Sequence, residues 1–517
     1  MPMRHLSDDL IHDILQYLRE DRVALYYSLC VNRFWSSQVV PLLWCQPFVN
    51  CPLSKRHLLI RTYISCFNTD ELNNLNPYKI NNLSEIQPTL FDYARYLESI
   101  SDCHLNSSVL DWIHKQINQK FSDFPVGSIT ASLWHLFLRK CVKIHSILIS
   151  PHYFNSLIPT LKSTLLTSTA LHSLRNLEIV IDRDFIKGKF PNTVEILKHL
   201  SLLCINIEYI EIKILRKINP LTQQLIIDII KTQQNLNEFK LTENWIHSTN
   251  IIPSLDVHID HITSLGLFSF LFDDTSIKIL SKFTCLESLQ LHKCGCIEKY
   301  PNRILSDAIF NLKSLFIVGT PSNLTTSIIA KAGHMLQLLV MDCVNNDMID
   351  FVSKYCPNIS MLYVELTQND YTLLFPWISS LQLETLEVKC SIESRNRTHL
   401  LSAIDSGKFL QLLSQHLPLT LTFLRLEGME ILPEDFNNFS KNCNVPLQTF
   451  IIQGILKHYN DDEVLYLISQ FATLHNKTLE LFGIDRDVIP QKWSKRLKKL
   501  GIDIFSIDDF ETLYKSY

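Results

Sequence analysis

The chain has 517 residues, of which 46% are hydrophobic and 19% are charged, an ordinary balance for a globular protein with an extensive core. A formal net charge of -4 gives no overall attraction to nucleic acid or to an anionic membrane, and no apolar run approaches the roughly 20 residues of a membrane span. The first ten residues lack the apolar segment of a secretory signal. We therefore expect the 14 cysteines to be reduced thiols in the cytoplasm or nucleus.

Residues 6–44 predict three short helices. The first has an apolar face built on Leu6, Leu10, Ile14 and Leu18, with Ile11 and Leu15 beside it. A second apolar set follows, made of Val23, Leu25, Leu29, Val31, Phe34 and Trp35. Pro41 is expected to end that helix before Trp44, because proline lacks the backbone N–H that a helix interior needs. Such a small unit rarely holds alone, so its apolar residues must pack in a shared core or against a partner.

The stretch from "LSDDLIHDILQYL" to "VNRFWSSQVVPLLW" resembles an F-box over residues 6–48. It departs from the family pattern at Ser7, where proline is usual, and at Asp9, where glutamate is usual. The resemblance implies docking to a Skp-family adaptor and, through it, to the cullin of a ubiquitin ligase. Arg33 lies on the pattern, and the residues expected to contact the adaptor are Leu6, Leu10, Ile14, Leu15, Leu18, Val31, Trp35 and Trp44. The other interpretation is that these helices are the first layer of a larger helical domain.

Residues 49–143 show no repeat and predict a helical linker region. From residue 144 one pattern recurs: apolar, two variable residues, apolar, one variable residue, apolar. Thirteen copies with a mean period of about 28 residues indicate leucine-rich repeats, which stack into a curved parallel sheet. The copies start at Ile144, Leu174, Ile207, Leu236, Ile262, Leu286, Leu312, Leu336, Ile359, Leu383, Leu421, Leu447 and Asn476.

The segment "FVSKYCPNISMLYV" refines the class of repeat. Cys356, Pro357 and Asn358 resemble the entry to cysteine-containing leucine-rich repeats, and Cys294 and Cys343 lie near the cysteine that follows the strand. The longer step after Leu383 predicts an insertion. The predicted α/β fold thus comprises an F-box at 1–48, a helical linker at 49–143, a solenoid at 144–490 and a C-terminal cap at 491–517, whose basic run is expected to be a solvated helix face.

The sequence offers few residues arranged for catalysis. It contains no phosphate-binding glycine motif, no His-Glu-x-x-His and no Gly-x-Ser-x-Gly. His292, Cys294 and Cys296 cluster in "LHKCGC", but zinc sites space their close pair more widely, so buried repeat cysteines explain them better. We therefore predict no catalytic residue, no metal and no cofactor.

In the predicted register, outward strand positions line the concave face of the solenoid, which such proteins commonly use for binding. The middle repeats place apolar residues there, and we predict these as the substrate-binding residues: Phe316, Val318, Leu338, Val340, Met361 and Tyr363. Charged and polar positions flank them, namely Glu178, Tyr209, Glu211, Glu238 and Lys240 on one side and Glu387, Lys389, Arg425 and Glu427 on the other. The alternative is that strand-forming residues occupy these positions without any ligand.

Together these features predict the substrate-recognition subunit of a Skp-cullin-F-box E3 ubiquitin ligase, with an unidentified protein substrate. Such a subunit is not an enzyme. It would hold the substrate near the ubiquitin-loaded component and so raise its effective concentration. The alternative is a leucine-rich-repeat interaction scaffold without a ligase role, whose N-terminal helices cap the solenoid.

Overall fold

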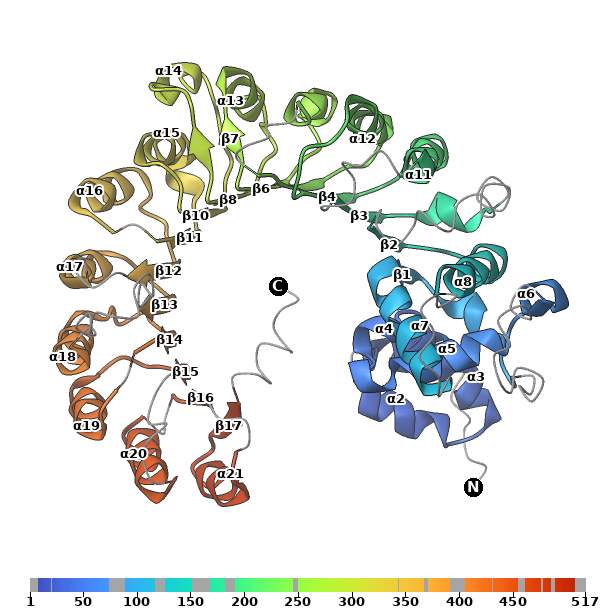
Figure 1. The fold of residues 1–517 in the computed structure, drawn as a ribbon. Coiled ribbons are helices and arrows are strands. Elements are labelled where there is room, and N and C mark those ends of the chain that lie inside the picture. The colour runs from blue at the N-terminus through green and yellow to red at the C-terminus, as the bar shows by residue number, and fades with distance from the viewer. Residues whose placement is uncertain are drawn as a thin grey trace. The chain divides into compact units, whose positions relative to one another are not determined.

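The computed structural model describes most of the chain, and the statements below concern its described residues only. These are residues 8–19, 21–73, 89–116, 126–150, 168–181, 191–244, 250–342, 344–366, 371–390, 405–429, 431–453, 461–475, 478–484 and 489–506. They form two compact units, Met1–Ile262 and Thr263–Tyr517, which are described separately (Figure 1).

The first unit begins with a layer of helices. They are α1 (Asp8–Tyr17), α2 (Arg22–Leu29), α3 (Arg33–Trp44), α4 (Pro47–Asn50), α5 (Arg56–Ile64), α6 (Thr69–Asn73), α7 (Asp102–Gln116) and α8 (Val126–Lys140), with 3-10 turns at Leu53–Lys55 and Tyr93–Tyr96. The first three helices share a small core made of Ile11, Leu15, Leu25, Val39 and Leu42. Asp21 and Asn32 begin α2 and α3 by accepting backbone N–H groups with their side chains, which is a common way to cap a helix.

The prediction that Pro41 ends the helix of the second apolar set is wrong. That set forms two helices, α2 and α3, and α3 continues through Pro41 to Trp44. A proline inside a helix removes one backbone hydrogen bond. Here Val39, Val40 and Leu42 on either side of it are buried, and their packing holds the last turn in place.

Five parallel strands pair in the order β1 to β5; β1 lies between α6 and α7, and the other four follow α8. They are β1 (Ser99–Ser101), β2 (Ser146–Ile149), β3 (Asn176–Ile181), β4 (Tyr209–Ile214) and β5 (Glu238–Thr242). The connections carry α11 (Pro191–Leu203), α12 (Pro220–Thr232) and 3-10 turns at Ala170–Ser173 and Ile252–His258. The sheet therefore starts inside the segment predicted as a helical linker. Its first anchor is the buried Leu97, which precedes β1 as Ile144 precedes β2.

In the second unit ten parallel strands line the inner side of a curved ribbon, with helices on the outer side (Figure 1). The strands are β6 (Ser264–Phe268), β8 (Ser288–His292), β10 (Ser314–Val318), β11 (Leu338–Met341), β12 (Met361–Leu366), β13 (Thr385–Cys390), β14 (Phe423–Glu427), β15 (Thr449–Ile452), β16 (Leu481–Ile484) and β17 (Asp503–Ser506). The helices are α13 (Asp274–Leu280), α14 (Pro301–Ile304), α15 (Ser322–Ala332), α16 (Asn346–Tyr355), α17 (Tyr371–Ser380), α18 (Ser406–His416), α19 (Pro433–Asn442), α20 (Asp461–Leu474) and α21 (Gln491–Lys498). A short ribbon of β7 (Leu271–Phe272) and β9 (Gly295–Cys296) lies apart from this sheet.

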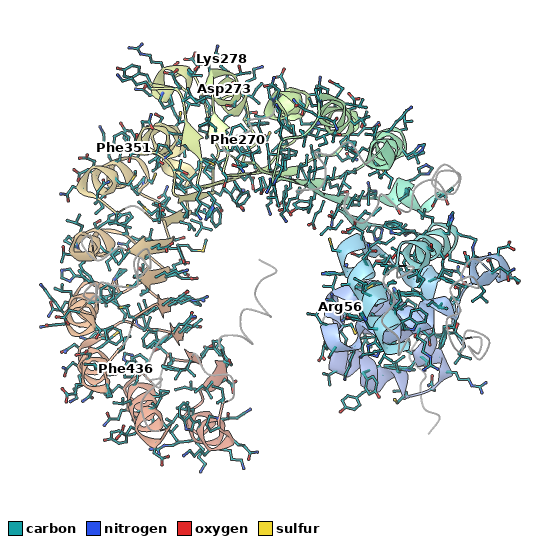
Figure 2. All side chains as sticks on the ribbon, viewed as in Figure 1. Arg56, Phe270, Asp273, Lys278, Phe351 and Phe436 are labelled. Atoms are coloured by element: carbon teal, nitrogen blue, oxygen red, sulfur yellow. The ribbon has the colours of Figure 1, made fainter. Side chains whose placement is uncertain are left out.

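The predicted leucine-rich-repeat solenoid is confirmed. In twelve of the thirteen predicted copies a strand begins two residues after the predicted start, and each of those twelve start residues is at most 1% exposed. Along most strands buried residues alternate with half-buried ones, because successive side chains point to opposite faces of the sheet. Aromatic rings fill the space between helices and strands, as for Phe436 of α19, whose ring stacks on Phe450 of β15 with centroids 6.3 Å apart (Figure 2).

Two boundaries at the C-terminal end are corrected. The last predicted copy starts at Leu479 rather than at Asn476, since β16 begins at Leu481 and Leu479 is buried as the anchor. The segment predicted as a cap contributes α21 and a further strand, β17, which pairs with β16. The predicted insertion lies largely outside the described residues.

The cysteines and asparagines of the repeats are structural. Burial raises the pKa of Cys294 and of Cys356 to about 12, and the Cys294 thiol donates to the Leu267 carbonyl oxygen at 3.2 Å. The Asn358 side chain donates to the carbonyl oxygen of His334, 2.6 Å away in the preceding repeat. Cys294 and Asn358 thus each bond a backbone carbonyl oxygen of another repeat, while Cys343 lies outside the described residues.

Candidate protein-interaction surfaces

Apolar residues of the N-terminal helices remain exposed after the small core is formed. Of the residues predicted to contact an adaptor, Leu10, Ile14 and Val31 are 51%, 42% and 57% exposed. Leu18 and Trp35 are half-buried and pack at the edge of the core. Leu6 lies outside the described residues. The predicted apolar face of α1 is therefore divided between the core and the surface.

Two further predicted contact residues pack against other parts of the first unit: Leu15 is buried and Trp44 is half-buried. Leu15 is fully buried in the core of the three helices, so it supports α1 without reaching the surface. The Trp44 ring lies against Tyr93 and Tyr63, with centroids 4.2 and 5.5 Å away. It therefore packs α3 against the helices that follow. Arg33 is exposed at the start of α3.

Sequence reasoning missed the most exposed apolar side chains of this region. Tyr17, Val23, Tyr26 and Tyr27 are between 63% and 92% exposed. The signal was present in α2, where the consecutive Tyr26 and Tyr27 cannot both face one small core. The N-terminal apolar surface is defined here as Leu10, Ile14, Tyr17, Val23, Tyr26, Tyr27 and Val31.

Several large apolar side chains exposed within two short helices and their flanking turns are unusual for a protein without a partner. Tyrosine is well suited to an interface, because it offers a broad apolar ring and a polar hydroxyl. In physical terms this region can bury apolar area against a second chain.

The second candidate surface lies on the concave face of the second unit. Strand pairing places Phe316, Val340 and Tyr363 side by side in one row across β10, β11 and β12. Leu338 and Met361 are neighbours in the adjacent row, and Val318 ends β10. All six predicted substrate-binding residues are half-buried on this face, and together they are called the central apolar patch. The predicted register thus brings these residues together.

Polar and charged residues border the central apolar patch in the same row. Gln290 is paired with Phe316 on one side, and Glu387 is paired with Tyr363 on the other. Arg425 follows Glu387 in the next strand. The row therefore changes from apolar to charged between β12 and β13.

The charges of this border are not paired evenly. Lys389 and Arg425 both approach Glu427, at 3.7 and 3.4 Å. Among the described residues, Glu387 makes no direct hydrogen bond or ion pair. Burial raises the pKa of Glu387, and the nearby Arg425 only partly opposes that shift. The carboxylate of Glu387 is thus partly desolvated without a direct partner.

Tyr363 lies close to several carboxylates of the same border. Burial raises its pKa to about 12, with further contributions from Glu427, Glu365 and Glu387. Burial likewise raises the pKa of Asp342, which accepts the backbone N–H of Gly319 at 2.7 Å. This edge of the central apolar patch therefore favours positively charged groups.

The concave face of the first unit differs, because its charges are largely paired internally. Lys213 contacts Glu211 at 2.9 Å, and Lys240 contacts Glu238 at 3.0 Å. The Tyr209 hydroxyl donates to Glu211 at 2.9 Å. Glu178 on β3 of the same face belongs to neither pair, and burial and the neighbouring Glu211 raise its pKa.

The described residues contain no group of three or more His, Cys, Asp and Glu side chains placed to hold a metal ion. Among the helices in that part of the chain, none combines the length and apolar character required to cross a bilayer. The fold is that of a leucine-rich-repeat solenoid.

No protein-family model and no curated protein matches this chain. Solved structures give weak matches: an internalin from Listeria monocytogenes (inlF) is 14% identical, with 65% of this chain and 81% of that chain covered at a TM-score of 0.30. The complex of Rad7 and Elc1 from yeast matches at 16% identity, with 69% and 88% covered and a TM-score of 0.37. The leucine-rich repeat-containing protein LegL7 from Legionella pneumophila matches at 16% identity, with 60% and 93% covered and a TM-score of 0.34. Matches this weak carry no functional argument.

Proposed function

We propose that the chain is the substrate-recognition subunit of a Skp-cullin-F-box E3 ubiquitin ligase. The observation that carries the proposal is the N-terminal apolar surface, which lies on α1, α2 and the turn after α2, in a segment whose sequence resembles an F-box. A Skp-family adaptor would cover this surface and connect the chain to a cullin.

The packing of α1 supports this division of labour. Ile11 and Leu15 belong to the core, whereas Leu10 and Ile14, one residue earlier in each case, are exposed. A helix that is apolar on two faces has one face more than a core of this size requires. The second face is the one that the adaptor would bury.

The three helices are also held firmly against the start of the sheet. The carbonyl oxygen of Cys45 accepts the backbone N–H groups of Glu98 and Ser99 at 2.9 and 3.2 Å. Arg19 contacts the Glu98 carboxylate at 3.6 Å, and Trp44 packs on Tyr93. An adaptor bound to α1 and α2 would therefore have a defined position relative to β1, as presentation of a substrate requires.

In this proposal the chain contributes binding and geometry, and other subunits perform ubiquitin transfer. Residues 1–48 form the adaptor-binding module, and residues 49–143 connect it to the predicted repeats and contribute β1 to their sheet. The repeats up to 490 with the segment 491–517 recruit the protein to be modified. The central apolar patch receives that protein. The site of action is the cytoplasm or nucleus.

Co-purification of the full chain with a Skp-family adaptor tests the proposal. We expect a stoichiometric complex for the natural chain and none for Leu10→Asp, because a carboxylate would be buried in an apolar interface. Leu58→Asp is the matched control, since Leu58 is 50% exposed on α5, outside the N-terminal apolar surface. Absence of a complex from the folded natural chain, or equal loss with Leu58→Asp, would refute the proposal.

The same experiment addresses the scaffold alternative. The contacts of Trp44 and Cys45 with the following segments favour a role for the first three helices in closing the end of the repeats. A cap needs those contacts but has no use for exposed Tyr26 and Tyr27. If no adaptor binds, the result favours the scaffold alternative, in which the first three helices cap the repeats.

A further inference from the structure

We infer that the segment recruited to the central apolar patch carries an unmodified lysine or arginine close to an apolar residue, with the basic side chain bound at Glu387. This inference rests on the proposed role of the concave face in recruiting a protein. It adds a chemical class of ligand to that role.

The apolar half of the site is set by the strand register. Phe316, Val340 and Tyr363 form a continuous row, with Leu338 and Met361 beside it. Neighbouring strands are about 4.8 Å apart, so the row offers roughly 10 Å of apolar surface to a chain that crosses the strands. One or two aliphatic or aromatic side chains of a ligand fill that length.

The basic half of the site begins one strand further on. Glu387 is paired with Tyr363 in the sheet, so its carboxylate lies about one strand spacing from the last apolar residue of the row. A lysine or arginine within about three residues of the apolar anchor spans that step, given the length of an extended chain. Its charged group would meet both the Glu387 carboxylate and the Tyr363 ring, two groups that bind cations.

The existing charge distribution explains why the site should select a cation. Arg425 and Lys389 converge on Glu427, and Glu387 has no direct partner among the described residues. A half-buried carboxylate without a direct partner is costly, and a ligand that donates hydrogen bonds to it relieves that cost. A cationic side chain is therefore stabilised here more than a neutral one.

Acidic or phosphorylated segments fit this surface poorly. Four carboxylates, those of Asp342, Glu365, Glu387 and Glu427, stand on the β11 to β14 part of the concave face. Lys389 and Arg425, the two cations on the same strands, are already close to Glu427. A phosphate placed here would meet like charges first, so the preferred ligand is an unmodified basic segment.

The test uses the full chain and a phage-displayed library of random twelve-residue peptides as the probe. The natural chain is expected to enrich peptides in which Lys or Arg lies within three positions of a Leu, Ile, Phe or Met. Glu387→Gln should retain the apolar preference and lose the basic one, because the glutamine is similar in shape but uncharged. Glu384→Gln is the control, because Glu384 is exposed immediately before the same strand and its substitution removes the same charge.

A selected peptide is then titrated by fluorescence anisotropy. We expect Glu387→Gln to weaken its binding about tenfold, typical of the loss of one charge-assisted contact, and Glu384→Gln to leave binding unchanged. The inference is overturned if no common peptide emerges, if basic residues are not enriched, or if both variants behave alike. Adaptor binding is measured on the same preparation, so a chain that binds the adaptor but selects non-basic peptides disproves this inference alone.

Discussion

Two leucines on the same helix offer a sharp test of how the N-terminal module is built. Leu15 of α1 is fully buried in the core of the first three helices, whereas Leu10 is 51% exposed. Replacing each in turn with alanine removes the same atoms from the same helix. The two variants should therefore differ only through the surroundings of the side chain.

The expected magnitudes follow from burial. Truncating a buried leucine to alanine costs about 2–5 kcal/mol, so Leu15→Ala should strongly destabilise the module. Full burial of a leucine is worth about 1.5–3 kcal/mol, so half-exposed Leu10 should contribute only about 1 kcal/mol to folding. The exposed half is what an adaptor can bury, and losing about 1 kcal/mol there weakens binding roughly fivefold.

Chemical denaturation gives the free energy of unfolding, and titration calorimetry with a Skp-family adaptor gives the affinity. We expect Leu10→Ala to keep nearly natural stability and lose affinity, and Leu15→Ala to lose stability first. Equal destabilisation by the two variants would contradict the observed packing of α1. An unchanged affinity of Leu10→Ala for a bound adaptor would contradict the assignment of the N-terminal apolar surface.

Three further predictions concern the repeats. Gly428 has φ of +78°, and a methyl group there would overlap the Cys390 carbonyl oxygen, so Gly428→Ala should lower the free energy of unfolding by about 2 kcal/mol or more; an unchanged denaturation midpoint would disprove this. The buried Asp102 carboxylate accepts the backbone N–H of Ser150 at 2.6 Å, so Asp102→Ala should cost about 2–3 kcal/mol in the same assay, and Asp102→Asn should cost less because it keeps an acceptor. Burial lowers the pKa of His258 from its usual 6.5, so the folded chain holds fewer protons than the unfolded one and stability falls as the pH drops below 6.5. The melting temperature should therefore decrease between pH 7.5 and pH 5.5, and the decrease should be smaller in His258→Gln.

The repeats could be predicted closely because their pattern is local. Each anchor and the two inward residues after it lie within six positions, and all three are buried in each of the twelve correctly placed copies. The first strand, β1, could not be predicted from the pattern because Asp102 occupies the last of the three positions, which the other copies fill with an apolar side chain. Near the C-terminal end the repeat pattern fits the sequence in two registers, one starting at Asn476 and one at Leu479. The structure has the register that starts at Leu479, in which Phe482 and Ile484 point inward.

The N-terminal helices were harder, since apolar spacing identifies a helix without saying which of its apolar residues meet the core. Leu10 and Leu15 both fit the same pattern, and only tertiary packing assigns one outward and one inward. Trp44 shows the same limit, because its neighbours Tyr63 and Tyr93 lie far from it in the sequence. Contacts between distant segments decide the outcome here.

The concave face combines both situations. The register that could be predicted from the sequence places Tyr363 beside Glu387 and Glu387 beside Arg425, and the structure confirms these neighbours. Register alone would pair Arg425 with Glu387, the residue directly opposite. Instead Arg425 contacts Glu427, two positions along its own strand β14. Lys389 of the neighbouring β13 also contacts Glu427. This pairing leaves the negative charge of Glu387 next to the apolar row, and the predicted preference for a basic ligand depends on that charge.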